Sequence, residues 1–564
     1  MTYEARWGLQ IEQPLTVAAP DTFEWHETAD LVVVGVGGAG AAAALEATER
    51  GLSVIGVDRY EGGGSSAANG GIFYAGGGTR IQRDAGETDT PEEMYKYLKL
   101  EVHDVVSDET LRHFCAESPA TIDWLMGHGA KFQGSVYKKS TSYPPLKYFL
   151  FHPDSTLVEP YVSIAKPAAR GHRGFMRNGK KAWGLGSSIY NPMRDAALKL
   201  GLVLHKYAEV RQLACDTEGR VVGVRVLQVT PNSRAAERFG EYIRKATHWL
   251  GVLPPTFPGS SITYGISAWY LRRAARIEAD HRQSRWLRAR KGVVLSAGGF
   301  ILNNPMVQHF APKYTAVMPN ATLGDMGSGI MLGASVGGAM NLMERVSAWR
   351  TLSPPKAWAD GMLVNASGAR FVNENIYSAA IGDAIVEKQQ GRAYIILDHA
   401  LRKQAFKQAF SPDILPFQRD IALLNMLFAA KKGKRADELA DLMGFDRATF
   451  RQTIETNNRA ARGEIPDPFQ KRSGDMAQLI DGPFYAIDAS VDSKLLPLAC
   501  MTVGGLVVDE ANGAVKRSDG TAIPGLYAAG RNAVGICSHL YVSGLSYADC
   551  VYSGRRAARA LAAS

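Results

Sequence analysis

Two residues near the carboxyl end of the chain carry side chains that can exchange a proton. Tyr541 and Ser543 lie two positions apart in SHLYVSGLSYADC (538–550), just before the last expected helix. In an extended segment, residues two apart point to the same side. A tyrosine has an ordinary pKa of about 10, and it becomes a base when neighbouring hydroxyls donate to its phenolate. The spacing therefore predicts a proton-transfer pair; the alternative is ordinary core tyrosines with satisfied hydroxyls.

The amino-terminal part of the chain has a glycine pattern typical of dinucleotide binding. We expect a buried strand at 31–34, an alanine-rich helix after it, and a second strand at 54–57 that ends in Asp58. Pyrophosphate binds at the N-terminus of such a helix, and an acid about 20 residues on binds the ribose hydroxyls. The alternative is a plain βαβ unit with Asp58 as a solvated strand end. The predicted contacts in the turn are Gly35, Gly37, Gly38, Ala39 and Gly40.

A second glycine-rich run follows Asp58 directly and favours FAD over NAD. Residues 59–79 read RYEGGGSSAANGGIFYAGGGT. Glycine lets the backbone come close to a large flat ligand, and the N–H groups of such a loop are donors for it. NAD enzymes do not usually need a loop of this kind. The residues of this run that we expect at the cofactor are Arg59, Ser65, Ser66, Asn69, Gly70 and Gly71.

Three later segments each show strands that lead into a turn or a glycine, at 201–226, 291–300 and 523–535. With the amino-terminal motif they resemble the FAD-binding domain of the fumarate reductase and succinate dehydrogenase flavoproteins, over about residues 30–564. The resemblance implies non-covalent FAD and a helix N-terminus near residue 545 that stabilises negative charge on the reduced flavin. Arg531 departs from the pattern, because many members carry an acid there. The further implied cofactor contacts are Val210, Ala297, Gly298, Asp325, Gly530, Asn532, Leu545 and Ser546.

Length and composition are those of a globular protein with more than one domain. The chain has 564 residues, of which 46% are hydrophobic and 21% charged, and this excludes disordered and fibrous proteins. The resemblance implies an α/β fold, in which a Rossmann-like FAD-binding domain (1–340 and 495–564) contains an inserted α+β substrate-capping domain (341–494). GARFVNE, in the insert, resembles the capping domain of the same group. We expect Arg370 and Glu374 there to form structural ion pairs.

The positions that hold a dicarboxylate in fumarate reductases carry no cation in this chain. Those reductases have an arginine four residues after the NE pair, a histidine beside a TMGG segment and an arginine before the last helix. Here these places read Ser378, ACMTVGG (499–505) and Tyr541. Because each missing cation would pair with a carboxylate, we expect a largely apolar substrate. Tyr377 and Tyr541 are the nearest polar replacements.

The two tyrosines resemble those of the 3-ketosteroid dehydrogenases, flavoproteins of the same fold. Removal of hydride from a saturated carbon needs a base for the adjacent C–H and a donor for the enolate oxygen. The Δ4-(5α) type has tyrosine-x-serine before the final helix and a tyrosine just after FVNE, as at Tyr541, Ser543 and Tyr377. The resemblance implies that Tyr541, assisted by the other two, takes a proton from C4 of a steroid. Hydride then passes from C5 to flavin N5, which gives a 4-ene-3-one.

Three alternatives to this reaction stay open. A Δ1-dehydrogenase has tyrosine-proline-x-x-glycine before the final helix, whereas Val542 follows Tyr541 here. An ene-reductase would run the reaction in reverse. A flavoprotein subunit of a membrane electron-transfer complex would usually have a covalent-flavin histidine and a dicarboxylate site, neither of which we find. No second redox motif is visible in the sequence, so the expected electron acceptor is external, a quinone or similar.

A basic segment, 245–291, interrupts the expected strands. Residues 242–291 hold ten Lys or Arg and two acids, so most of the net charge of +9 is local, and nucleic acid is not an expected partner. An apolar helix face edged by arginine predicts peripheral contact with an anionic membrane; the alternative is a dimer contact or a solvated helix. The residues at helical spacing on this face are Ile266, Trp269, Tyr270, Ala274 and Ile277.

The remaining sequence features concern metals and location. The five cysteines have neither metal-ligand nor haem spacing, so no metal site and no disulfide framework is expected. The sequence shows no secretory signal and no apolar run long enough to span a membrane. We expect a cytoplasmic protein, peripheral on the inner face of the cell membrane through 245–291.

Overall fold

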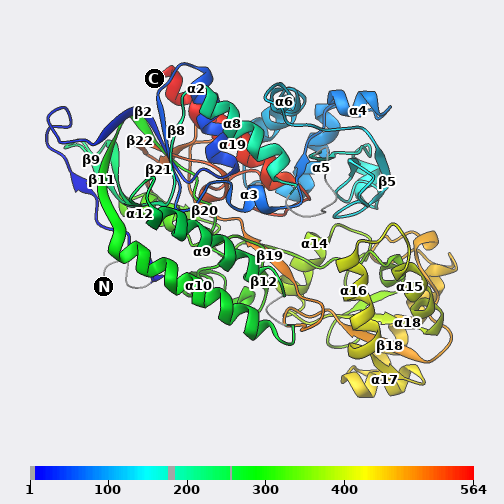
Figure 1. The fold of residues 1–564 in the computed structure, drawn as a ribbon. Helices are drawn as coiled ribbons and strands as arrows, with labels where there is room; N and C mark the ends of the chain where they lie inside the picture. The colour runs from blue at the N-terminus through cyan, green and yellow to red at the C-terminus, as the bar shows by residue number, and fades with distance from the viewer. Residues whose placement is uncertain (1–6, 176–184, 254–256) are drawn as a thin grey trace.

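A nine-stranded sheet lies at the centre of the larger part of the molecule (Figure 1). The computed structural model describes residues 7–175, 185–253 and 257–564. In this sheet β22, β11, β2, β3 and β8 pair in parallel, and β9, β10 and β11 form an antiparallel meander. The strands are β1 (Leu15–Thr16), β2 (Glu27–Val34), β3 (Val54–Val57), β8 (Val203–His205), β9 (Ala208–Cys215), β10 (Val221–Val229), β11 (Arg282–Leu295), β21 (Ala514–Lys516) and β22 (Ala522–Ala528).

Continuous apolar runs explain the parallel strands. All four residues of β3 are buried, as are the last four of β2. Val32 in β2 lies between Ile55 in β3 and Val293 in β11. Strands that are covered on both faces need apolar residues at successive positions rather than at alternate ones. The strands predicted at 31–34 and 54–57 are confirmed, and β2 begins earlier, at Glu27.

Three helices pack together beside the parallel strands, namely α2 (Gly38–Glu49), α8 (Ser187–Lys199) and α19 (Leu545–Ala563) (Figure 1). The alanines of α2 are buried and small, so α19 approaches this helix closely. A Cβ atom on Gly554 would overlap the carbonyl oxygen of Ala39. Glu46 of α2 pairs with Arg555 at 2.7 Å and with Arg559 at 3.1 Å. The carboxyl-terminal helix is therefore fixed against the glycine turn that opens α2.

A smaller four-stranded sheet, in the order β4-β7-β6-β5, lies beside the ends of these helices. The N–H of Tyr74 in β4 donates to the carbonyl of Gly544, the residue that precedes α19. The elements of this region are α3 (Gly64–Ala68), β4 (Ile72–Tyr74), α4 (Arg80–Asp84), α5 (Pro91–Val102), α6 (Asp108–Gly127), β5 (Val136–Ser140), β6 (Leu150–His152), α7 (Tyr161–Ile164) and β7 (Gly171–Arg173).

A separate antiparallel sheet, in the order β15-β16-β18-β17, forms the core of the smaller part, in yellow and orange in Figure 1. Arg370 pairs with Glu374 at 2.9 Å and also with Asp467, and Lys471 reaches Glu374 at 2.9 Å. The structural ion pair expected at Arg370 and Glu374 is confirmed. The elements are α13 (Lys356–Asp360), β15 (Met362–Val364), α14 (Ser378–Asp383), β16 (Tyr394–Leu397), α15 (His399–Ala409), α16 (Pro416–Leu424), β17 (Lys431–Gly433), α17 (Ala436–Met443), α18 (Arg447–Ala461) and β18 (Phe484–Asp488).

Short strands connect the two parts. The sheet β12-β19-β14 and the pair β13-β20 lie where the chain enters and leaves the smaller part. The boundaries at 341 and 494 stay a prediction. The connecting elements are α11 (Asn304–Phe310), β12 (Met318–Pro319), α12 (Ser328–Ser335), β13 (Met340–Asn341), β14 (Val346–Trp349), β19 (Ala499–Thr502) and β20 (Gly505–Leu506).

The basic segment forms most of a helical hairpin, α9 (Arg234–Leu250) and α10 (Ser260–His281), whose helices run side by side (Figure 1). Residues 254–256 of the segment lie outside the described residues. Phe239, Ile243 and Ala274 form a small core with Tyr60 and Leu323 packed against it. Part of the apolar face of α10 is therefore buried inside the protein and is not available to a membrane.

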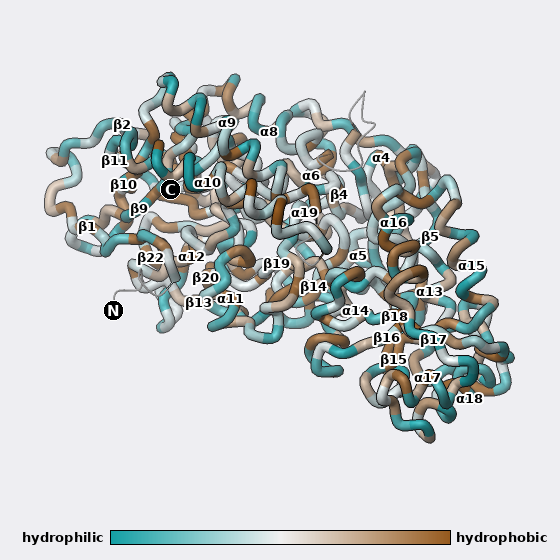
Figure 2. Tube along the Cα trace, turned by 60° about the horizontal axis from the view of Figure 1, so that its bottom comes forward, coloured by the Kyte–Doolittle hydropathy of each residue, from teal (hydrophilic) through white to brown (hydrophobic). Residues whose placement is uncertain are grey.

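The α/β class and the inserted α+β part agree with the fold expected from the sequence. Figure 2 shows hydrophobic segments within both parts and hydrophilic segments along the outer loops. No helix in the described segments is long and apolar enough to cross a membrane.

Candidate active site

The turn between β2 and α2 leaves room for a ligand beside the helix N-terminus. Gly35 has a φ of +89°, and a Cβ atom there would overlap the backbone of Ala297. Gly37 has an ordinary φ of −83°, and a Cβ atom there would meet nothing closer than 3.7 Å. The packing of the protein itself therefore does not require glycine at position 37. The open space fits a ligand that lies directly on the backbone, as a pyrophosphate does.

Asp58 holds this turn to the end of β3. Its carboxylate accepts hydrogen bonds from the N–H groups of Val36 at 2.9 Å and Tyr60 at 2.8 Å. Burial raises the pKa of Asp58, although these N–H groups act to lower it. The acid lies at the glycine turn, as the motif predicts. Its contact with a ribose stays a prediction.

The second glycine-rich run packs against the turn and against a distant loop. The N–H of Gly38 donates to Ser66 Oγ at 3.1 Å, and Ser65 Oγ donates to the carboxylate of Asp325 at 2.5 Å. Asn69 Oδ1 accepts from the N–H of Gly71 at 2.7 Å. The Tyr143 hydroxyl donates to the carbonyl of Gly70 at 3.1 Å. Four of the six residues predicted in the run thus shape the loop through their side chains or backbone N–H and carbonyl groups, and a fifth, Ser65, fixes Asp325.

The carboxyl-terminal segment completes the same region. Asn532 accepts a hydrogen bond from the N–H of Ala297 and donates to the carbonyl of Gly298 at 3.1 Å. A Cβ atom on Gly530 would lie 2.9 Å from that of Ala39, so the two predicted residues are neighbours. Leu545 and Ser546 open α19. These contacts bring segments from both ends of the chain to one place.

Arg59, one of the predicted cofactor contacts, belongs to an ion-pair network beside Val210. Arg59 pairs with Glu209 at 2.9 Å, and Glu209 also pairs with Arg211 at 2.6 Å and with Arg282 at 3.1 Å. Val210, next to Glu209, is buried in β9. Glu278 of α10 lies 3.9 Å from Arg59. The basic hairpin therefore contacts the predicted nucleotide site directly, which the sequence did not indicate.

Tyr541 lies at the entrance to α19 with its hydroxyl held by the backbone. The N–H of Gly544 donates to the Tyr541 hydroxyl oxygen at 3.0 Å. The Tyr541 ring lies 5.2 Å from that of Trp349 and 6.4 Å from that of Tyr377, between ring centroids. Residues 377 and 541 come from the smaller and the larger part of the molecule. The two tyrosines are therefore neighbours across the two parts, and their catalytic role stays a prediction.

Four hydroxyl side chains gather at this site. Ser543 Oγ donates to the carbonyl of Ser142 at 3.1 Å, and the Ser142 and Ser378 hydroxyl oxygens lie 3.0 Å apart. The Tyr377 hydroxyl interacts with Ser378, Ser543 and Ser142. The backbone N–H of Tyr377 donates to Ser155 Oγ at 2.9 Å, which fixes the start of α14. The cluster links three segments that are far apart in the sequence.

The phenol groups are harder to ionise than free tyrosine. Burial raises the pKa of Tyr541 to about 12, although the N–H of Gly544, the charge of Arg531 and the hydroxyl of Ser543 act to lower it. Burial also raises the pKa of Tyr377 well above its ordinary value, against the effect of the neighbouring serines. The hydroxyl that was expected to help make Tyr541 a base does not offset this rise in pKa, because desolvation outweighs the hydrogen bonds. The catalytic role of Tyr541 stays a prediction.

Sequence reasoning missed three residues of this region. Ser142 lies in the loop before Tyr143 and has no spacing relationship to Tyr541. Trp349 covers the Tyr541 ring from β14. Arg531 was noted only as a departure from a family pattern, yet it pairs with Asp325 at 2.6 Å. That departure was the only signal available for any of the three.

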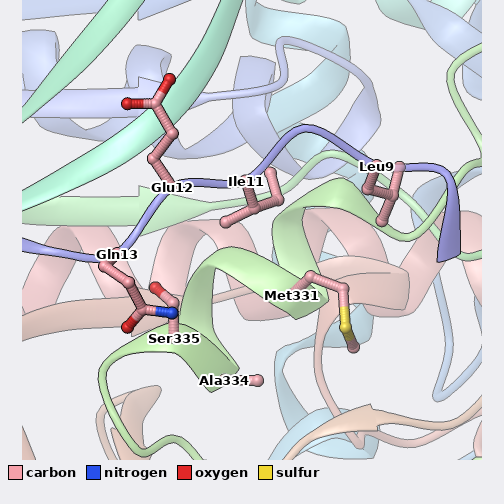
Figure 3. A pocket seen from close by; sticks show the side chains of 7 residues that line it. All are labelled: Leu9, Ile11, Glu12, Gln13, Met331, Ala334 and Ser335. Carbon is pink, nitrogen blue, oxygen red and sulfur yellow. The ribbon is translucent and has the colours of Figure 1, made fainter. Parts of the chain in front are cut away.

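A crevice elsewhere on the molecule lies between the amino-terminal segment and α12 (Figure 3). Its lining residues are Leu9, Ile11, Glu12, Gln13, Met331, Ala334 and Ser335. None of the predicted site residues lines it. Within the described residues, no group of three or more His, Cys, Asp or Glu side chains could hold a metal ion.

Comparison with known proteins identifies the class to which this site belongs. Residues 30–544 match the family model described as FAD binding domain. The chain therefore belongs to this family of flavoproteins. FAD is its cofactor, in agreement with the glycine turns and with the open space beside Gly37.

Several relatives match nearly the whole chain. A 3-oxo-5-alpha-steroid 4-dehydrogenase of Comamonas testosteroni is 35% identical over 92% of this chain and 96% of its own length. A 3-oxosteroid 1-dehydrogenase of Mycolicibacterium smegmatis is 26% identical over 91% of this chain and 93% of its own. The crystal structure of the 3-ketosteroid-Δ4-(5α)-dehydrogenase of Rhodococcus jostii with 4-androstene-3,17-dione has a TM-score of 0.79 at 28% identity, and covers 98% of this chain and 100% of its own.

Proposed function

We propose that the protein desaturates a 3-ketosteroid between C4 and C5. A proton leaves C4 to the protein, a hydride leaves C5 to the cofactor, and the C4=C5 double bond forms next to the 3-oxo group. The observation that carries this reaction is the cluster of Tyr541, Ser543 and Tyr377, uncharged hydroxyls that include Tyr541 at a position where a dicarboxylate enzyme needs a cation. The similarity to a steroid 4-dehydrogenase over 92% of the chain supports the same substrate class.

Residues at both ends of the chain would hold the cofactor. The N-terminus of α2 and Gly37 would face the pyrophosphate, and the N-terminus of α19 would face the flavin ring. When bound, FAD accepts the C5 hydrogen as hydride at N5. We propose that the cofactor contacts predicted from the sequence bind FAD.

Tyr541 is placed to polarise the ketone. Its oxygen already accepts the Gly544 N–H, so its own proton is free to be donated to a carbonyl oxygen. A raised pKa keeps that proton in place at neutral pH. As negative charge develops on the steroid 3-oxygen, this donor stabilises it. We therefore assign donation to Tyr541 rather than the role of base.

Ser543 and Tyr377 provide the path for the C4 proton. Ser543 Oγ donates to the Ser142 carbonyl, which leaves its lone pairs available to accept a proton. As Ser543 takes up the C4 proton it passes its own to the Tyr377 hydroxyl, the hydroxyls of Ser378 and Ser142 relay a proton in the same way, and solvent water takes up the last one. A chain of hydroxyls moves a proton without a permanently ionised base.

Product analysis tests the reaction. The purified holoenzyme would be given an artificial electron acceptor and either 5α-androstane-3,17-dione or 4-androstene-3,17-dione. We expect the first to become the second, and the second to stay unchanged. Conversion of 4-androstene-3,17-dione alone would instead establish the Δ1 reaction, the activity named for the 26% identical relative.

Each turnover leaves two electrons on the cofactor, so an acceptor must regenerate it. We propose an external acceptor of the quinone type. Reoxidation of the steroid-reduced enzyme by a water-soluble ubiquinone analogue, followed by the recovery of the oxidised flavin absorbance, tests this. Reoxidation no faster than with buffer alone would contradict it.

We also propose that the α9–α10 hairpin touches an anionic membrane on the cytoplasmic side. Ile262 is 68% exposed and Trp269 is 42% exposed on α10, and Arg273 lies over the Trp269 ring at 4.2 Å. An exposed apolar pair next to an arginine fits the interface of an anionic membrane. A steroid dissolved in that membrane could reach the protein from there.

Point variants test the membrane contact better than deletion, since the hairpin also supports Arg59. Ile262→Glu with Trp269→Glu is expected to release the protein from vesicles of phosphatidylglycerol and phosphatidylcholine in a pelleting assay. Phe410→Glu, on an exposed residue of the smaller part, is the matched control. Equal pelleting of both variants and the unaltered protein would remove the proposal.

A further inference from the structure

Arg531 stands inside the predicted cofactor site, between two residues assigned to it. It belongs to the short 3₁₀ turn Gly530–Asn532 after β22. The N–H of Gly530 is bound by Ser553 Oγ at 2.9 Å, and Asn532 is bound to Ala297 and Gly298. The backbone on both sides of Arg531 is therefore held by hydrogen bonds, and this fixes the position of the Arg531 Cα atom.

One nitrogen of the Arg531 guanidinium has a partner in the protein. Nη2 pairs with the Asp325 carboxylate at 2.6 Å, and the side chain of Arg531 is 9% exposed. The same carboxylate accepts from Ser65 Oγ and from the N–H of Gly299 at 3.0 Å. Asp325 therefore has no remaining capacity for the rest of the guanidinium.

The other terminal nitrogen, Nη1, is buried, and no described residue accepts a hydrogen bond from it. A Cβ atom on Gly299 would lie 3.2 Å from this nitrogen, so the group lies over the Gly298–Gly299 turn at the end of β11. An unsatisfied buried donor costs about 1–3 kcal/mol, and more when it is charged. A ligand oxygen in the site would remove this cost.

The position of the charge limits which part of the ligand it can reach. Asp325 and Ser65 mark one side of Arg531. On the other side, Arg531 interacts with the Tyr541 phenol. Burial raises the pKa of this phenol, and the positive charge of Arg531 acts to lower it. Cys537, which precedes α19, and Cys550, within it, also interact with the charge. Arg531 thus lies between the pyrophosphate turn and the reacting end of the site.

We propose that Arg531 is a cofactor-positioning residue that donates from Nη1 to an oxygen of the FAD ribityl or ring portion, with Asp325 holding it in place. The cofactor gains negative charge when it takes up hydride. A fixed cation nearby therefore favours its reduced form and raises its midpoint potential. This inference rests on FAD as the cofactor and needs no assumption about the steroid.

The test compares Arg531→Met with Arg531→Lys. For each holoenzyme, FAD is removed and titrated back while flavin fluorescence is followed, and the midpoint potential is measured by spectroelectrochemistry. Arg531→Met is expected to weaken FAD binding by at least tenfold and to lower the preference for the reduced form by about tenfold. A tenfold change corresponds to about 30 mV for a two-electron couple. Arg531→Lys should keep most of the potential and lose part of the affinity.

Asp325 would lose its counterion in Arg531→Met, so a further variant separates the two effects. Arg531→Met with Asp325→Asn removes the pair as a neutral unit. If Arg531 only neutralises Asp325, the double variant will recover the original potential and Kd for FAD, and the proposal is overturned. If the potential stays low in the double variant, the charge acts on the cofactor. Arg419→Met, on an exposed arginine of the smaller part, should change neither value.

Discussion

The N–H of Gly544 donates to the Tyr541 hydroxyl oxygen at 3.0 Å, at the residue that precedes α19. The same short segment thus orients the phenol and begins the helix whose N-terminus we propose faces the flavin. Because the phenol oxygen accepts a hydrogen bond from Gly544 on one side, its O–H points away from that N–H. The geometry favours a stationary donor over a base that must change its charge.

Replacing Tyr541 with Phe removes this donor and keeps the ring that packs on Trp349. Loss of one such donor typically costs about 100- to 1,000-fold in kcat. We expect that loss in steroid turnover, with the flavin absorbance spectrum and the Tm unchanged. Tyr148→Phe is the control, since its ring packs against Tyr137 and under Lys147. If Tyr541→Phe is about as active as the control, Tyr541 contributes only to packing and is not a hydrogen-bond donor in the reaction.

Ser543→Ala and Tyr377→Phe interrupt the proposed proton path at successive groups. General base catalysis contributes roughly 100- to 10,000-fold, so we expect losses in that range for each variant, and a double variant no worse than the poorer single one. Exchange of the C4 hydrogen with D2O, followed by mass spectrometry without an electron acceptor, isolates the proton step. Wild-type exchange in Ser543→Ala would show that another group takes the proton.

The buried cluster around Glu374 predicts acid sensitivity of the smaller part. Burial acts to raise the pKa of Glu374, but Arg370 and Lys471 outweigh it and lower that pKa from 4.5 to about 2. A lowered folded-state pKa contributes stability above the unfolded value, and this stability is lost as the pH falls from about 4.5 through about 2. Its size is roughly 3 kcal/mol.

Glu374→Gln should therefore lower the Tm strongly at pH 7 and much less near pH 2.5. The variant also leaves the buried Lys471 without its carboxylate and Arg370 with Asp467 alone, which adds to the loss at pH 7. Calorimetry across this range measures the difference. Glu464→Gln is the control, because its ion pair with Arg462 is exposed to solvent. A constant Tm difference at all pH values would disagree with the shifted pKa.

Glu101 predicts a pH dependence of opposite sign. Burial raises its pKa to about 7, although the Tyr97 hydroxyl, which donates to Glu101 Oε1 at 2.7 Å, acts to lower it. A carboxyl whose folded-state pKa is raised stabilises the fold below the unfolded value and loses that contribution as the pH rises through about 7. Glu101→Gln, which carries no titrating group, should gain Tm relative to the unaltered protein between pH 5 and pH 8.5. A parallel pH dependence of the two proteins would contradict this.

The nucleotide half of the protein was readable from the sequence because its signals are local. Gly35, Gly37 and Asp58 lie on one βαβ unit, where strand, turn and helix follow each other directly. The same holds for the Tyr541–Ser543 pair, because both residues belong to the short segment that precedes α19. Short-range geometry of this kind depends on neighbouring residues, so it can be predicted from the sequence without knowledge of the rest of the fold.

Only the tertiary structure decided the surroundings of these groups. It brings Tyr377 and Ser142 to Ser543, pairs Arg531 with Asp325, and packs the basic hairpin onto Arg59. It also buries the Tyr541 phenol, which raises its pKa to about 12. Desolvation and long-range pairing depend on which segments meet in space. The spacing of residues along the chain does not determine these contacts.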